Sequence, residues 1–265
     1  MHAKLTHRQG LWITVLLSIT VLTIFYGNLF GKLNQVSFAS GGDGMQSFVN
    51  MDYHIRYDTT YLRCNSMNYP YGEHVFFTNN QPLISNTIRF ILRNVTDVSD
   101  YALGVLNGAM LLSLLLTPLF LYLILTGFGT APLFSALAAV GINFLTPQLD
   151  RFGGHFNLSY VIAIPLMIWL LIRFFKKPGW TVTFTIFIVV IAGALTHFYL
   201  YGFFGVIILF FFASYLVKND TALTRARLLL HLFVQLVLPF LILQAFYLSD
   251  HVTDRPGYPW GFLYY

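Results

Sequence analysis

The sequence GGDGMQSFVNMDYHIRYDTTYLRCNSMNYPYGEHVFFTNNQPLIS, residues 41–85, decides how the chain is organised, because it is a long polar stretch in an otherwise apolar chain. Charged residues recur through it, whereas long uncharged runs follow from Tyr101 onward. Charge inside a bilayer is costly, so this stretch is not expected to cross a membrane. We therefore predict that residues 31–100 form a large polar loop, and that the apolar runs on either side form membrane helices.

The composition supports an all-α integral membrane protein. Of the 265 residues, 57% are hydrophobic and 9% are charged, whereas a soluble domain has roughly 25% charged residues. In a membrane protein the placement of Lys and Arg matters more than their sum, so the net charge of +5 does not indicate nucleic acid. The one cysteine, Cys64, excludes an intramolecular disulfide.

The apolar runs predict about seven membrane helices in a single transmembrane domain over residues 1–265. A helix needs about 20 apolar residues to cross a hydrocarbon layer of about 30 Å. The first run is longer than the roughly 7–15 residues of a signal-peptide core, so we interpret it as a retained span. The predicted spans are Leu11–Phe30, two within Tyr101–Leu149 that are broken at Gly127–Pro132, Phe152–Ile172, two within Pro178–Val217 that are broken near His197–Gly202, and Leu228–Ser249.

Two segments of the polar loop have helical patterns. One has apolar residues at Met45, Phe48, Val49, Met51 and Ile55. The other has Ile84, Ile88, Ile91 and Leu92 on one side. Amphipathic segments of this kind often lie in the membrane interface, so we predict two interfacial helices.

The placement of the cations predicts the orientation. Cytoplasmic loops are enriched in Lys and Arg, and a cytoplasmic N-terminus places most short-loop cations inside. The polar loop and most of the acidic residues then lie on the outer face. The inner loops would hold Arg173, Lys176, Lys177, Lys218, Arg225 and Arg227, with Asp220 as their acid.

Asp43 is the first candidate for chemistry. It stands in Gly-Gly-Asp-Gly soon after the first span, and glycines allow a close backbone approach to a ligand. A carboxylate at the membrane surface could act as a general base or bind a divalent cation, Mg or Mn, through oxygen. The alternative is an ordinary turn aspartate that accepts from local backbone N–H groups.

Other candidates have two interpretations each. His54 and Asp58 are four residues apart, so they could hold a metal or form a solvated helical face. Glu73 follows a Tyr-Pro-Tyr-Gly turn and could point into solvent or into a pocket. His197 ends the fifth predicted span, where a hydrogen-bonded core histidine is the plainer interpretation.

The short loop 147–155 holds Asp150, Arg151 and His155 beside two glycines. Arg151 and His155 at headgroup level could bind a lipid phosphate. Asp150 and Arg151 could equally form a surface pair of little energetic value. The sequence has no Walker loop, HExxH or CxxC, which argues against a nucleotide-driven pump. Few charges lie within the spans, which argues against an ion channel or a proton-coupled transporter with a site at the midplane.

The order of these features resembles the GT-C superfamily of membrane glycosyltransferases, which use polyprenyl-phosphate-linked sugars. The resemblance covers essentially the whole chain as architecture. It rests on Gly42-Asp43-Gly44 after the first span, the turn Tyr69–Glu73, the segment Asn80–Leu83, and the second loop Asp150–His155.

This resemblance implies that Asp43 is a catalytic base and that Asp150 is a supporting acid, with both available to a metal. It implies that Arg151 and His155 bind the donor phosphate, and we include Glu73, His54 and His197 as candidate substrate-binding residues. Members of the superfamily continue with further spans and often a C-terminal domain, so we expect this chain to lack that variable module. We expect it in a bacterial inner membrane, acting in the cell envelope.

The leading hypothesis is therefore transfer of a sugar from a polyprenyl-phosphate donor to a glycan, lipid or protein acceptor at the outer face. The alternatives are a non-catalytic transporter or flippase, and a scaffold that binds a glycan-lipid without turning it over. Replacing Asp43 by Asn discriminates between them, because it would abolish the reaction and leave transport or binding intact.

Overall fold

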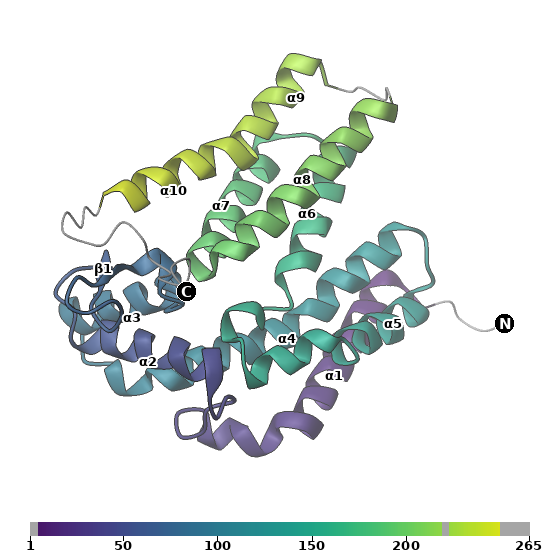
Figure 1. Cartoon of the computed structure of the whole chain (residues 1–265). Helices are drawn as coiled ribbons and strands as arrows, with labels where there is room; N and C mark the ends of the chain where they lie inside the picture. Colours follow the sequence, from purple (N-terminus) through teal and green to yellow (C-terminus); the bar gives the residue numbers. More distant parts are fainter. Residues whose placement is uncertain (1–4, 219–222, 250–265) are drawn as a thin grey trace, which may run out of the picture.

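The computed structural model describes residues 5–218 and 223–249, and these fold mainly as helices (Figure 1). The long helices are α1 (His7–Tyr26), α4 (Ala102–Gly127), α5 (Pro132–Phe144), α6 (Ala163–Lys176), α7 (Trp180–Thr196), α8 (Phe198–Lys218), α9 (Arg225–Leu232) and α10 (Leu238–Leu248). A π-helical turn, η6 (Phe233–Val237), joins α9 to α10. Every predicted apolar run is thus at least partly helical.

Five helices are long and apolar enough to cross a membrane: His7–Lys32, Ser99–Gly127, Phe156–Lys176, Phe198–Val217 and Arg225–Leu248. A sixth span is obtained if α5 and the following turn η4 (Pro147–Gly153), which are bent by 40°, count as one. Helix α7 has only 17 residues, so it would be about 25 Å long at 1.5 Å per residue. The structure supports a multi-pass, all-α membrane protein with five to six spans by length and composition, not the full set of seven.

The predicted span Phe152–Ile172 starts too early. Its first part forms two 3-10 turns, the end of η4 and η5 (Phe156–Leu158), and α6 begins only at Ala163. The reason is packing: Phe152 and Phe156 are buried in a core that includes Met51 and Ile55 of the polar loop. These aromatic residues hold the polar loop against the membrane helices.

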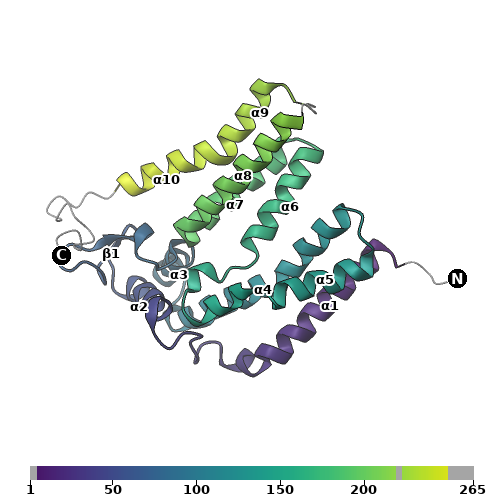
Figure 2. The same cartoon turned by 45° about the vertical axis from the view of Figure 1, so that its right-hand side comes forward.

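The membrane helices form two groups (Figures 1 and 2). Helices α1, α4 and α5 pack on one another, while α6, α7, α8 and the α9–α10 pair form the second group. Contact between α4 and α6 joins the groups. Each group has its own apolar core, which follows from the apolar sequence of all these helices.

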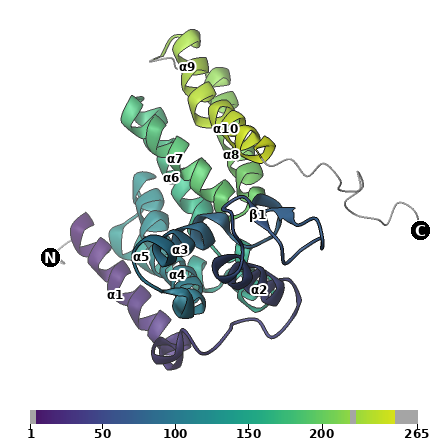
Figure 3. The ribbon, with the colours of Figure 1, turned by 90° about the vertical axis from the view of Figure 1, so that its left-hand side faces the viewer.

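The polar loop contains both predicted interfacial helices. They are α2 (Gly42–Arg56) and α3 (Pro82–Asn94), and a short antiparallel pair, β1 (Arg63–Cys64) and β2 (Glu73–His74), lies between them. Together α2, the strand pair and α3 are called the loop unit (residues 42–94). Helix α3 contacts both α2 and α7, so the loop unit sits across the ends of the membrane helices (Figure 3). The buried residues Met51, Ile55 and Ile88 belong to the predicted apolar stripes.

The short-loop cations gather at the opposite end of the second helix group. Arg173 and Lys176 lie in the last turn of α6, and Arg225 and Arg227 lie at the start of α9, at the top of Figure 1. Asp43, Asp52 and Asp58 lie in the loop unit at the other end. This separation agrees with the predicted orientation, which stays a prediction. Asp220 lies outside the described residues.

Candidate functional site

Asp43 and His155 meet at the junction of the two polar loops. Asp43 is in the first turn of α2, and His155 follows η4. The Oδ2 atom of Asp43 lies 3.1 Å from Nδ1 of His155, with the two side chains 60% and 43% exposed. Within the described residues, no hydrogen bond joins the Asp43 carboxylate to a backbone N–H, so the turn-aspartate interpretation is not what the structure shows. The pair is accessible to a second molecule.

Glycines allow α2 to approach the second loop. Gly42 has φ +61°, a conformation that side chains disfavour. A Cβ atom on Gly44 would lie 2.6 Å from Cβ of Ala39 and 3.3 Å from the carbonyl carbon and oxygen of Gly154. The backbone of α2 therefore packs directly against the residue before His155, which fixes the Asp43–His155 contact.

Asn79 joins the polar loop to two other parts of the chain. Its carbonyl oxygen accepts a short hydrogen bond from Oγ of Ser47, one turn after Asp43 on α2, and a second of 3.2 Å from Nδ2 of Asn157. Its side-chain Oδ1 lies 3.2 Å from Nε2 of His197. One residue thus connects α2, the second loop and the α7–α8 junction.

His197 is positioned as a neutral hydrogen-bonding group. Its Nδ1 accepts from the backbone N–H of Tyr199 at 3.3 Å, which leaves Nε2 to donate to Asn79. Burial lowers the pKa of His197 below its ordinary value. The plainer interpretation of this histidine, a hydrogen-bonded structural residue, agrees with these contacts, and the bond to Asn79 places it at the edge of the site.

His54 lies away from the surface, contrary to the prediction of a solvated helical face. His54 and Asp58 are 0% and 1% exposed and their Nδ1 and Oδ2 atoms are 2.7 Å apart. The other ring nitrogen lies 2.8 Å from Oδ1 of Asn86, whose Nδ2 donates to the carbonyl of Tyr61. With both ring nitrogens engaged, His54 stabilises the loop unit and offers no free atom to a substrate.

Arg89 of α3 completes this buried cluster. It is fully buried and donates short hydrogen bonds to the carbonyls of His54 and Asp58 at the end of α2. Burial lowers the pKa of the Arg89 guanidinium. Arg93 donates to the same Asp58 carbonyl at 2.7 Å. A helix C-terminus carries partial negative charge, so two arginines are well placed there.

One group of three His, Cys, Asp or Glu side chains within the described residues is close enough for a metal ion: His54, Asp58 and Cys64, all buried. The group fits a metal poorly. His54 and Asp58 already form a hydrogen bond with each other, so these atoms are not free to bind an ion. Burial raises the pKa of the Cys64 thiol, which disfavours the thiolate that metals require. Asp43 and Asp150 are not in this group.

Glu73 points into the protein rather than into solvent. It is 8% exposed, and its carboxylate accepts from Nδ2 of Asn68 at 2.7 Å and from the backbone N–H of His74 at 3.0 Å. These bonds hold the turn that contains the cis peptide Tyr69–Pro70.

Asp150 and Arg151 are exposed on η4. Among the described residues neither side chain has a hydrogen bond or ion pair, so the ordinary surface pair between them is absent. The structure brings Asp43 to His155 and His197 to the Asn79 turn, but it does not bring Glu73 or His54 to the same surface.

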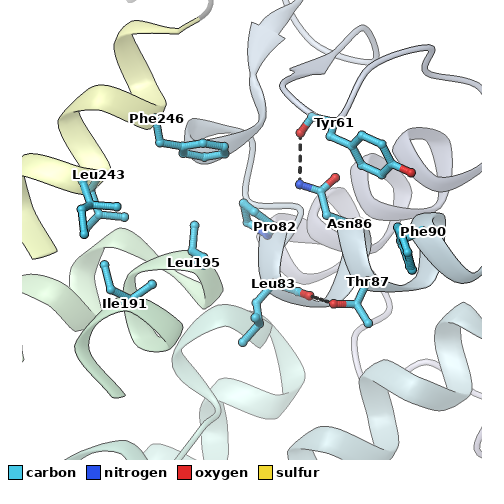
Figure 4. Close-up of a pocket in the computed structure, with 11 residues that line it drawn as sticks. Tyr61, Pro82, Leu83, Asn86, Thr87, Phe90, Ile191, Leu195, Leu243 and Phe246 are labelled. Carbon is cyan, nitrogen blue, oxygen red and sulfur yellow. Dashed lines mark hydrogen bonds between the residues drawn. The ribbon is translucent and has the colours of Figure 1, made fainter. Parts of the chain in front are cut away.

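An apolar groove runs between α3 and the membrane helices α7 and α10 (Figure 4). It encloses about 530 Å³. Its polar wall residues use their groups within the protein: Nδ2 of Asn86 donates to Tyr61, and Oγ1 of Thr87 donates to the carbonyl of Leu83. The lining is Tyr61, Pro82, Leu83, Asn86, Thr87, Phe90, Ile191, Leu195, Ile242, Leu243 and Phe246. The groove thus offers hydrocarbon contact.

Sequence reasoning missed Ser47, Asn79 and Asn157. Each is a single polar residue with no motif around it, and their partners are 32 to 118 residues away along the chain. One local signal was available for Ser47, which is four residues after Asp43 and so lies on the same face of α2.

No curated protein and no solved structure matches this chain. A family described as a domain of unknown function (DUF6311) matches residues 15–262, which includes both loops, the second half of α1 and all of the later helices. The chain therefore belongs to the DUF6311 family.

Proposed function

We propose that this protein transfers a sugar from a polyprenyl-phosphate-linked donor to an acceptor hydroxyl at the outer face of the membrane, as its resemblance to the GT-C glycosyltransferases implies. The observation that carries the proposal is the contact between Asp43 and His155. Two candidates chosen from separate loops, 112 residues apart, lie 3.1 Å from each other and are open to solvent.

Asp43 is suited to the role of general base. Its carboxylate accepts the proton of the acceptor hydroxyl as the oxygen attacks the anomeric carbon. A new C–O bond forms there while the bond between that carbon and the phosphate oxygen breaks. The polyprenyl phosphate leaves with the bonding electrons.

His155 and Arg151 are suited to the leaving group. They lie four residues apart in the second loop, and the backbone N–H of His155 donates to the carbonyl of Arg151 at 2.7 Å, which keeps them in one turn. Cationic groups that face a departing phosphate stabilise the charge that develops on it. In this proposal the contact with His155 also holds Asp43 in place between turnovers.

The apolar groove supports a lipid-linked donor. It lies beside the Asn79 turn, because Pro82 and Leu195 on its wall are three and two residues from Asn79 and His197. A hydrocarbon chain in this groove would be shielded from water, which is favourable in proportion to the apolar area buried.

The proposal includes a divalent cation, Mg or Mn. Asp43 and Asp150 are the carboxylates that would hold it. Exposed carboxylate oxygens are suitable donors for either ion. The cation would supply charge stabilisation at the phosphate, and the proton transfer would still be the work of Asp43.

The test is sugar transfer from a short-chain polyprenyl-phosphate sugar to an added acceptor by purified protein, with donor binding measured in parallel. We expect Asp43→Asn to retain donor binding and to lose at least about 100-fold in turnover, since a general base contributes about 10²–10⁴-fold. Arg151→Ala should weaken donor binding.

Asp97→Asn is the matched control, because Asp97 is an exposed acid of the same loop that bonds only to Ser99 nearby. It should keep wild-type turnover. Donor binding without turnover by the wild type would support the non-catalytic scaffold. Absence of donor binding by the folded wild type would reject the lipid-linked donor.

A further inference from the structure

Three neighbouring residues at the start of α3 carry buried polar atoms without a protein partner. They are Nδ2 and Oδ1 of Asn80, Nε2 of Gln81 and Oγ of Ser85, within the part of the chain that the structure describes. The side chains belong to residues that are 0%, 1% and 0% exposed. Buried polar groups without a hydrogen bond are rare because each loses its bonds to water on folding.

The three residues share one region. The backbone N–H of Ser85 donates to the carbonyl of Gln81 at 3.0 Å, so the two lie one helical turn apart on the buried face of α3. Asn80 directly precedes Gln81. Pro82 and Asn86, the chain neighbours of Gln81 and Ser85, line the apolar groove, whereas Asn80, Gln81 and Ser85 lie behind its wall (Figure 4).

The surrounding turn is fixed in an uncommon conformation. Asn79 and Gln81 have φ of 56° and 53°, in the left-handed region that non-glycine residues rarely adopt. The bonds from Asn79 to Ser47, Asn157 and His197 hold the turn from three sides. The Oε1 atom of Gln81 is taken by the hydroxyl of Tyr160 at 2.5 Å, which leaves its NH₂ group to donate elsewhere.

We propose that Asn80, Gln81 and Ser85 form a binding site for a hydroxyl group. The amides of Asn80 and Gln81 need an acceptor, whereas Oδ1 of Asn80 needs a donor. A hydroxyl supplies both, whereas a carboxylate or fully ionised phosphate only accepts and a metal ion does neither. The hydroxyl comes either from a water molecule or from the head of an amphiphile whose chain lies in the groove.

This inference does not depend on catalysis, and its test measures stability rather than turnover. Ser85→Ala and Asn80→Leu remove the buried polar atoms, the first with almost no change in volume and the second with a side chain of the same branched shape. If a hydroxyl occupies the site, each should lower the Tm by about 2–4 °C or more, because the occupant loses a bond. Asn94→Ala is the matched control on α3, since its side chain is exposed, lies outside the groove and bonds only to its own helix.

The detergent identifies the source of the hydroxyl. Tm is measured in a dodecyl glycoside and in a dodecyl phosphocholine, which has the same chain and no hydroxyl in its head. A Ser85→Ala loss of equal size in both detergents identifies water. A loss confined to the glycoside identifies the head of the amphiphile. The proposal is rejected if Ser85→Ala and Asn80→Leu are as stable as the wild type, or more stable, in both detergents.

Discussion

Asn79 stabilises the site through two different groups, and these can be separated by mutation. Its side chain bonds to His197, while its backbone in the left-handed region presents the carbonyl to Ser47 and Asn157. Asn79→Gly should lose only the side-chain bond. Asn79→Ala should be destabilised by about 1–2 kcal/mol more, because Ala resists φ of 56°. Thermal unfolding of the two variants checks this, and equal Tm values would contradict it.

His197 makes the stability of the protein depend on pH. Burial lowers its pKa in the folded state from the ordinary value of 6.5, so the unfolded chain takes up a proton first as pH falls. The unfolded state is thereby favoured, and stability is lost as pH drops through and below 6.5. The Tm should fall between pH 7.5 and pH 5, and His197→Gln should reduce that fall. An unchanged pH dependence in the variant would assign it to other groups.

At the scale of elements, Arg89 fastens α3 to the end of α2. Arg89→Met leaves the carbonyl of His54 without its hydrogen-bond donor, whereas the carbonyl of Asp58 still accepts a hydrogen bond from Arg93. A lost bond to a charged group costs about 1.5–3 kcal/mol. We expect Arg89→Met to lose about that much, and Arg89→Lys to lose less because Lys retains one donor.

Limited proteolysis of the loop unit measures this loss of stability. When α2 separates from α3, the segment between the two helices becomes accessible to the protease. A more stable Arg89→Met protein would show that the cost of burying the guanidinium exceeds its bonds.

Close packing of α2 against the second loop should be sensitive to one methyl group. Gly44→Ala places a Cβ atom 2.6 Å from Ala39 and pushes α2 away from Gly154. Overpacking of this kind costs about 1–3 kcal/mol, and it should also widen the Asp43–His155 contact and reduce sugar transfer. Gly153→Ala is the control, because nothing lies within 4 Å of its added Cβ. Tm and turnover of the pair provide the measurement.

The elements themselves were readable from periodicity. The apolar stripes of residues 45–55 and 84–93 became α2 and α3, and the predicted break near His197–Gly202 is the α7–α8 junction at His197. The start of α6 could not be predicted, because single aromatic residues such as Phe152 and Phe156 occur both in membrane spans and in buried cores. The burial of His54 could not be predicted from the sequence, because its partner Asn86 lies on another helix.

At the scale of the whole molecule, the separation of acids and cations predicts which face each loop occupies. In a Cys64→Ala background, Tyr69→Cys should react with a membrane-impermeant maleimide from the outer side of intact cells, since Tyr69 is 90% exposed. Arg225→Cys should react only after the membrane is opened. The reverse pattern would invert the orientation and place Asp43 in the cytoplasm.

The bond between Asn79 and His197 also sets an order of assembly during synthesis. Residues 47, 79 and 157 leave the ribosome before residue 197, so the Asn79 turn gains its last anchor only after α7 has been made. Contacts so distant in sequence form late, because a long chain must first be brought together. A nascent chain halted before His197 would have α2 and α3 already synthesised but the Asn79 turn still without this anchor. The loop turn beside the proposed site would therefore gain its last support only after the α7–α8 junction had been synthesised.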